Sequence, residues 1–162
     1  MSRLITLAAA VCITIATSLA MASEYEQGDL TIADPWSRPT PPGAAVGAGY
    51  MVISNSGEDD ITLIGGETPK AARVSIHETV EEGGVMRMQP LREGLVVPAG
   101  GKVELKPHSY HLMLEQLTSG IEEGQQIPLT LSFEGAGDME VTLRVKSLDG
   151  DDMSDSKGHN SH

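Results

Sequence analysis

Hydrophobic and polar residues alternate along much of this chain, most clearly near its C-terminal end. In residues 127–133 and again in 139–145, every second side chain is apolar, and Gly135-Ala136-Gly137 lies between the two runs. A period of two is typical of a β-strand with one buried face. The two runs are therefore predicted to pair as a hairpin.

Similar short apolar runs occur through most of the chain. The other predicted strands span residues 30–33, 46–55, 61–64, 73–80, 85–91, 95–97, 103–105 and 110–114. Asp34-Pro35 and Gly65-Gly66 are expected to end the strands that precede them. Eighteen glycines and nine prolines favour turns over long helices. Many short strands at this spacing predict an all-β sandwich.

The first 22 residues have the pattern of a secretory leader. Arg3 precedes an apolar run over residues 4–20, and Ala20-Met21-Ala22 forms a small-x-small cleavage site before Ser23. A run of this length also permits an uncleaved membrane anchor. We expect cleavage, because a cleavage site and polar sequence follow the run. The mature protein is then exported and does not span the membrane.

The only cysteine, Cys12, lies within this leader. Ala9-Ala10-Val11 precedes it without a leucine three residues earlier, which is not typical of a lipoprotein motif. The mature chain would have no thiol. That excludes disulfides, cysteine catalysis and a blue-copper electron-transfer site, which needs a thiolate ligand.

Two further segments complete the predicted organisation. Residues 23–146 form the β-sandwich domain, and residues 147–162 form an acidic, almost entirely polar tail that is expected to be disordered. The tail carries Met153, His159 and His162. It either only solubilises the protein or forms an accessory metal site.

The charge and the motif content exclude several functions. The chain has 11 basic and 23 acidic residues, a net charge of −12, so a nucleic-acid partner is not expected. It has no nucleophile elbow, phosphate-binding glycine loop or zinc-protease motif. Glu81 and Glu82 are adjacent and would point to opposite faces of a strand. We therefore expect a protein that is not an enzyme.

The stretch from residue 77 to residue 113 gathers potential metal ligands. A turn centred on Glu82 and Gly83 would place His77 opposite Met88, with Cβ atoms ~5 Å apart. Met86 would share their face one step nearer the turn. His111 and Met113, two residues apart on another strand, would also share a face. Whether the two pairs meet does not follow from these patterns.

The chemistry of these side chains favours one metal. Two thioethers and two neutral imidazoles suit Cu(I), whereas Mg, Ca and Mn prefer oxygen ligands. Zinc would be expected to recruit thiolate or carboxylate. The alternative is that the methionines fill the core and the histidines are surface groups. Trp36, the only tryptophan, is expected in the core, or alternatively in the wall of the metal site.

At these residues the chain resembles the periplasmic copper chaperones of the PCuAC type. His77 is followed by ten residues, Met88, twenty-two residues and His111-Leu112-Met113, close to the family pattern. The resemblance extends over residues 28–146. Further matching segments are residues 34–39 (DPWSRP), 42–44 (PGA), 47–51 (GAGYM), 83–88 (GGVMRM), 97–100 (VPAG) and 127–131 (IPLTL). A departure is His108, where relatives usually carry glycine, so this residue is a further candidate ligand.

The resemblance implies a cupredoxin-like β-sandwich that binds Cu(I) through His77, Met88, His111 and Met113. It also implies delivery of copper to a cytochrome c oxidase copper-centre subunit, or to an assembly thiol protein that precedes it. We expect a monomer. Met86, His108 and the tail residues Met153, His159 and His162 are candidates for accessory binding, with Cu(II) as the candidate ion in the tail. Two alternatives remain open, a copper sequestration or resistance protein and a metal-free interaction module.

Overall fold

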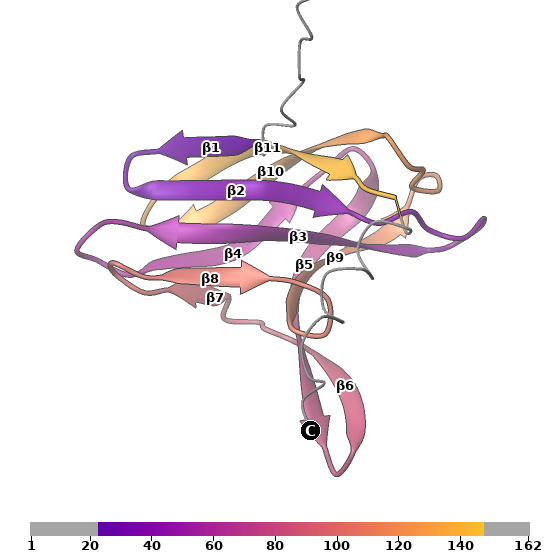
Figure 1. Ribbon diagram of the computed structural model, residues 1–162, viewed down its shortest axis with the longest axis horizontal. Helices are drawn as coiled ribbons and strands as arrows, with labels where there is room; N and C mark the ends of the chain where they lie inside the picture. Colours follow the sequence, from indigo (N-terminus) through magenta and orange to yellow (C-terminus); the bar gives the residue numbers. More distant parts are fainter. Residues whose placement is uncertain (1–22, 148–162) are drawn as a thin grey trace, which may run out of the picture.

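The computed structural model describes residues 23–147 and is built from strands (Figure 1). The strands are β1 (Glu24–Gln27), β2 (Leu30–Ser37), β3 (Val46–Asn55), β4 (Ile61–Glu67), β5 (Ala71–Glu82), β6 (Val85–Pro90), β7 (Leu95–Val97), β8 (Lys102–Leu105), β9 (Tyr110–Leu117), β10 (Gln126–Glu134) and β11 (Gly137–Val145). The predicted all-β class is confirmed. Within residues 23–147 no helix is long and apolar enough to cross a membrane.

The strands close into a flattened barrel. Hydrogen-bonded neighbours run in the order β5-β9-β3-β2-β11-β10-β4, and β4 returns to β5 through the pair Gly66 and Val74. In Figure 1, β2 and β3 cross the front of the view, and β4 and β10 lie behind them. Strands β1, β6 and β7 extend the ring, and β8 lies beside β3 and β9. This arrangement is a β-sandwich whose two sheets are joined at their edges.

The core is formed by the inward faces of the alternating strands. Strands β10 and β11 pair as predicted, with Leu129 opposite Val141 and Leu131 opposite Met139. All four side chains are buried. Burying a side chain of this size stabilises a fold by roughly 1.5–3 kcal/mol. The core therefore rests on the same period-two pattern that identified the strands.

Two strands continue through residues that were predicted to end them. Strand β2 passes Asp34 and Pro35 and ends at Ser37, with a shift of register between Ala33 and Trp36. Asp34 has a φ of 46°, so the chain bulges there and then resumes pairing. Strand β4 likewise passes Gly65 and Gly66. A Cβ on Gly66 would lie 2.7 Å from the carbonyl oxygen of Thr130, so only glycine allows this close approach.

The predicted register of the β5–β6 hairpin is wrong by two residues. Gly83 and Gly84 form the two-residue turn with φ values of 61° and 80°, a geometry that favours glycine. His77 consequently lies opposite Pro90, and Met88 lies opposite Thr79. An even shift keeps every side chain on its face. His77, Met86 and Met88 thus still share a face, as predicted.

The β5–β6 hairpin projects from the barrel (Figure 1). All six residues of β6 are exposed, and β6 pairs only with β5. The hairpin is therefore an arm at the edge of the sheet, whereas β9 lies between β5 and β3.

Candidate metal centre

Strands β5 and β9 bring the two predicted histidine ligands together. His77 lies directly opposite His111, with ring centroids 5.9 Å apart and ring planes 32° apart. An imidazole nitrogen about 2 Å from a metal ion places its ring centre about 3 Å from that ion. Two rings bound to one ion would thus have centres up to about 6 Å apart. The observed separation fits one shared ion.

The ring orientation of His111 is fixed by the backbone. Its Nδ1 lies 3.0 Å from the carbonyl oxygen of Ser109, and its side chain is 6% exposed. A carbonyl oxygen only accepts hydrogen bonds, so Nδ1 carries the proton and donates it. The lone pair of Nε2 is left available, which is the usual way in which a metal-binding histidine is oriented.

His77 is held by side chains in the opposite tautomer. Its Nε2 lies 3.0 Å from the hydroxyl oxygen of Ser75, and this hydroxyl is hydrogen-bonded to the carboxylate of Glu115. A carboxylate only accepts, so Ser75 donates to Glu115 and accepts from Nε2–H of His77. Among residues 23–147, the buried Nδ1 of His77 has no hydrogen-bond partner. A buried nitrogen without a partner costs about 1–3 kcal/mol, which a bound metal ion would offset.

The electrostatic setting of His77 keeps its ring neutral. Burial lowers the pKa of His77 below its ordinary value of 6.5, and His111 and Arg73 lower it further. The negative charge of Glu115 acts in the opposite direction without reversing the shift. A neutral imidazole is the form that binds metals.

The thioethers lie in a cleft of about 550 Å³ that His111 also lines, whereas His77 is not among its lining residues. Met113 pairs with Ser75 on β5 and with Ala48 on β3, and it is half-buried. The cleft is lined by Arg38, Pro39, Thr40, Pro41, Val46, Gly47, Ala48, Tyr50, Thr79, Met86, Met88, Pro107, His108, His111 and Met113. In the described part of the chain, no three His, Cys, Asp or Glu side chains gather. A metal bound here would therefore depend on methionine sulfur.

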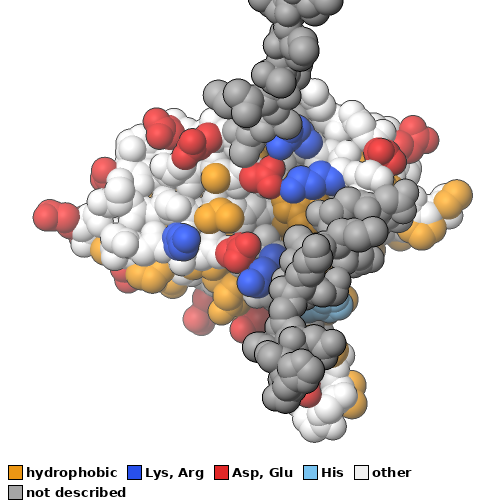
Figure 2. All heavy atoms as spheres, in the orientation of Figure 1, with side chains coloured by type: hydrophobic (Ala, Val, Ile, Leu, Met, Phe, Trp, Pro, Cys, Tyr) orange, Lys and Arg blue, Asp and Glu red, His pale blue; other side chains and the backbone are white. Residues whose placement is uncertain are grey.

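Three of the ligand candidates that line the cleft are exposed to solvent. Met86 and Met88 are 50% and 63% exposed on β6. His108, with a φ of 62°, is exposed in the loop before β9 and lines the same cleft. Figure 2 shows histidine (pale blue) at the base of the projecting hairpin and apolar side chains along it. The tail candidates Met153, His159 and His162, like the leader, lie outside the described residues.

Ser75, Ser109 and Glu115 were not identified from the sequence. The signal was present for two of them, because Ser75 is two residues before His77 and Glu115 is two residues after Met113. A period of two places each on the ligand face.

Trp36 neither fills the core nor lines the cleft. It is half-buried and packs against Tyr50, with ring centroids 4.5 Å apart. Tyr50 is the residue that lines the cleft. Burial raises the pKa of Tyr50, and the nearby charge of Arg38 opposes the rise. Trp36 thus contacts the cleft wall through Tyr50 and Arg38.

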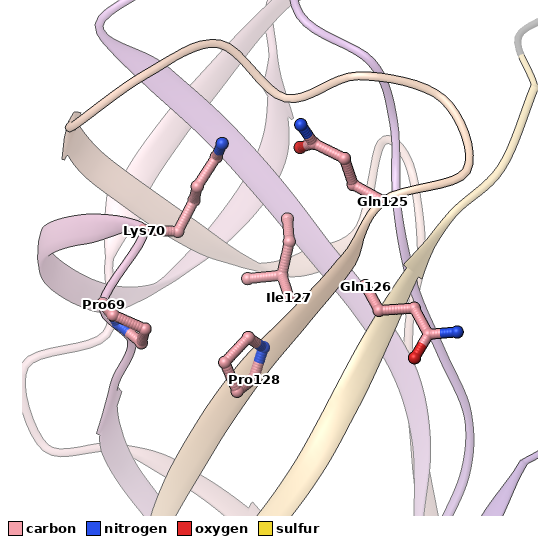
Figure 3. Close-up of a pocket in the computed structure, with 6 residues that line it drawn as sticks. All are labelled: Pro69, Lys70, Gln125, Gln126, Ile127 and Pro128. Carbon is pink, nitrogen blue, oxygen red and sulfur yellow. The ribbon is translucent and has the colours of Figure 1, made fainter.

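Another hollow, of about 390 Å³, lies beside the start of β10 (Figure 3). It is lined by Pro69, Lys70, Gln125, Gln126, Ile127 and Pro128. None of these side chains is a preferred ligand for a soft metal. The β5–β9 cleft is therefore the better candidate for a metal centre.

Comparison with known proteins assigns the chain to a family. The model of the LpqE-like family, described as "Putative lipoprotein LpqE-like", matches residues 30–145. The chain belongs to the LpqE-like family. The match includes every strand of the closed barrel.

Curated relatives share part of their length with this chain. "Putative lipoprotein Lxx21020" of Leifsonia xyli subsp. xyli is 32% identical over 108 residues, covering 67% of this chain and 65% of the relative. "Uncharacterized protein RP573" of Rickettsia prowazekii is 25% identical over 114 residues, covering 68% and 63%. The match thus spans just under two thirds of each relative.

Solved structures confirm the PCuAC resemblance and the fold. The apo PCuAC domain from PmoF1 aligns with a TM-score of 0.66 and 23% identity, covering 77% of this chain and 99% of the domain. The copper-bound PCuAC domain from PmoF2 gives 0.66 and 24%, covering 77% and 98%. The solution structure of CuI-DR1885 from Deinococcus radiodurans gives 0.58 and 25%, covering 81% of each chain.

Proposed function

We propose that this LpqE-like protein is a Cu(I)-binding metallochaperone. His77, Met88, His111 and Met113 hold the ion. The observation that carries the proposal is the pair of histidines opposite each other on β5 and β9, each with one ring nitrogen held by a hydrogen bond. Within residues 23–147, the other ring nitrogen of each histidine has no hydrogen-bond partner. Support comes from PmoF2 and DR1885, whose domains share this fold and are described as copper-bound and CuI-loaded.

The ligand set indicates what the protein does with its cargo. Two imidazoles and two thioethers carry no charge, so they favour Cu(I) over Cu(II) and over oxygen-preferring ions. They bind less tightly than thiolates, which permits transfer to a protein with stronger ligands. We propose that the acceptor is an oxidase copper-centre subunit or an assembly thiol protein. The leader pattern and the lipoprotein name of the Leifsonia relative support a periplasmic location.

A second candidate function, copper sequestration, is favoured by one observation. Met86 and His108 line the cleft together with Met88, His111 and Met113, so the cleft offers more donors than one ion needs. A deletion strain separates the two functions. Normal oxidase activity with copper sensitivity would support sequestration, whereas loss of oxidase activity would support delivery.

The first test is a Cu(I) titration of residues 23–162 against a coloured chelator. It includes Met88→Ala and a chain that ends at Lys146. We expect one tight equivalent that is lost in Met88→Ala and kept in the shorter chain. Absence of competition with the chelator would refute the chaperone proposal and favour a metal-free interaction module. Loss of the equivalent in the shorter chain alone would move the site to the tail.

A further inference from the structure

Arg38 stands out because its charge is not compensated. Its guanidinium lies 5.6 Å from the ring centroid of Trp36 and 6.0 Å from that of Tyr50. Within residues 23–147 it forms no side-chain hydrogen bond and no ion pair. Other cations near it are paired, since Arg144 and Lys146 both bind Asp34.

Arg38 lies on the wall of the metal cleft. It is the only Lys, Arg, Asp or Glu among the residues that line this cleft. Tyr50 lines it too, and in the described part of the chain its hydroxyl forms no hydrogen bond with another residue. A guanidinium and a phenol hydroxyl on one wall are donors that match a carboxylate. The cleft thus combines soft metal ligands with an anion-binding surface.

The surroundings hold this surface in place. Asp34 bonds Arg144 at 3.0 Å and Lys146 at 2.9 Å, and Lys146 lies 4.6 Å from the centroid of Trp36. The Ser37 hydroxyl donates to the carbonyl of Ala48 at 2.6 Å. These contacts join the strand that carries Trp36 to β11 and β3. Segment 34–39 contains no proposed metal ligand. We infer that its role is to hold Arg38 in position.

We propose that Arg38 and Tyr50 form a docking subsite for an acidic side chain of the protein that receives copper. The inference rests on the proposed function, because the acceptor must enter the cleft to reach the metal ligands. The cleft rim is apolar, with Val46 44%, Met86 50% and Met88 63% exposed. An arginine stacked on aromatic rings within an apolar rim is typical of an interaction hot spot.

Charge decides which residue of the acceptor fits. The chain carries a net charge of −12, so its general field attracts basic surfaces. At the cleft the local charge is positive instead. Enclosing Arg38 against an acceptor without a counter-ion would be costly, because a desolvated charge needs a partner. A glutamate or aspartate next to the acceptor's copper ligands meets this need and fixes the orientation of docking.

The test uses two synthetic acceptor peptides. Both contain the same pair of cysteines as Cu(I) ligands, and they differ at one flanking position, Glu in one and Gln in the other. Transfer from Cu(I)-loaded protein is followed by stopped-flow absorbance of the Cu(I)–thiolate band. We expect transfer to the Glu peptide to be about tenfold faster. Arg38→Gln should remove this preference.

Control variants separate docking from folding and from copper binding. Lys102→Gln removes an equal charge from β8, outside the cleft, and should leave the preference unchanged. Tyr50→Phe keeps the ring that packs on Trp36 and should reduce the preference about threefold. The Cu(I) affinity of Arg38→Gln, measured by chelator competition, should equal that of the wild type, since Arg38 is not a metal ligand.

Three outcomes would overturn the proposal. The first is that the wild type transfers copper to both peptides at the same rate. The second is that the preference for the Glu peptide persists in Arg38→Gln. The third is that millimolar acetate removes the preference, which would identify a site for free small carboxylates. Failure of the wild type to bind Cu(I) would refute the proposed function instead, and it would be seen before any transfer is measured.

Discussion

Strands β9 and β6 both supply ligand candidates, but they differ in strand pairing and in burial. Strand β9 is paired on both sides, by β5 and β3, and its His111 is 6% exposed. Strand β6 is paired only by β5, and its Met88 is 63% exposed. In the proposed site, His111 and Met113 on β9 would form the fixed half, and Met88 on the β6 arm would form the half open to solvent. This division suits a carrier, because the ion can be approached from the arm while the buried half keeps its geometry.

The largest effect is expected where the fixed half is broken. His111→Ala removes a buried ligand and leaves the carbonyl of Ser109 without its donor. We expect Cu(I) affinity to fall about a hundredfold or more, and the free energy of unfolding to fall by about 1–3 kcal/mol. Chelator competition and urea denaturation measure the two quantities. Full affinity in this variant would remove β9 from the site.

Breaking the exposed half should separate affinity from stability. Met88→Leu keeps the size of the side chain and removes the sulfur. We expect about a thirtyfold loss of Cu(I) affinity with an unfolding free energy within about 0.5 kcal/mol of the wild type. Met86→Leu is the matched control and should lose much less. A larger loss in Met86→Leu would reassign the ligand to Met86.

The support of His77 can be tested without touching a ligand. Ser75→Ala removes the hydroxyl that accepts from Nε2 of His77, so the ring loses its fixed tautomer. Losses of this kind typically reduce metal affinity 10–100-fold, and we expect about tenfold. Ser132→Ala, on β10, is the control and should have no effect on affinity. Unchanged affinity in Ser75→Ala would show that the tautomer is not set by Ser75.

The lowered pKa of His77 predicts a dependence on pH. The ordinary value is 6.5, and the folded value lies below it. The unfolded chain therefore takes up a proton first as the pH falls. The stability of the metal-free protein should be full above pH ~6.5 and should decline as the pH passes through the lower folded pKa. Cu(I) affinity should decline as the pH falls below the folded pKa, because the proton then competes with the ion for His77.

Paired titrations between about pH 7.5 and 5 check this prediction. Met88→Leu is the control, since a thioether does not titrate, and its midpoint should match that of the wild type. A decline of affinity that begins well above pH ~6.5 would contradict the direction of the shift.

The smallest effect is expected at the tip of the arm. Gly84 has a φ of 80° and no atom within 4 Å of an added Cβ, so Gly84→Ala costs only backbone strain of about 1 kcal/mol. We expect faster amide exchange in β6 and little change in the melting temperature. Gly120→Ala, where φ is not positive and the nearest atom would lie 3.8 Å from an added Cβ, is a comparison outside the arm. Cooperative loss of protection in the whole barrel would show that the arm is not independent.

The sequence predicted local structure better than long-range pairing. Alternation in β10 and β11 and the glycines between them identified that hairpin. The face shared by His77, Met86 and Met88 was also predicted, because a register shift of two residues leaves each side chain on the same face of the sheet. The alignment of His77 with His111 was not predictable, since it depends on how β5 meets β9, and these two residues are 34 positions apart in the sequence. The bulge at Asp34 was hidden because the partners of that carboxylate lie 110 and 112 residues away.

The parallel pairing of β2 with β11 also determines the order in which the chain can fold. Arg144 pairs with Trp36 and Val145 with Ser37, so the barrel joins nearly the first strand to the last. A chain that emerges from a ribosome or a pore with its N-terminus first cannot close this seam until β11 is free. Pairings so distant in sequence are associated with folding in milliseconds to seconds rather than microseconds. During that interval the end of β2, at Trp36 and Ser37, remains unpaired on the side that β11 will occupy, which makes the emerging chain a substrate for holding chaperones and a target for proteases.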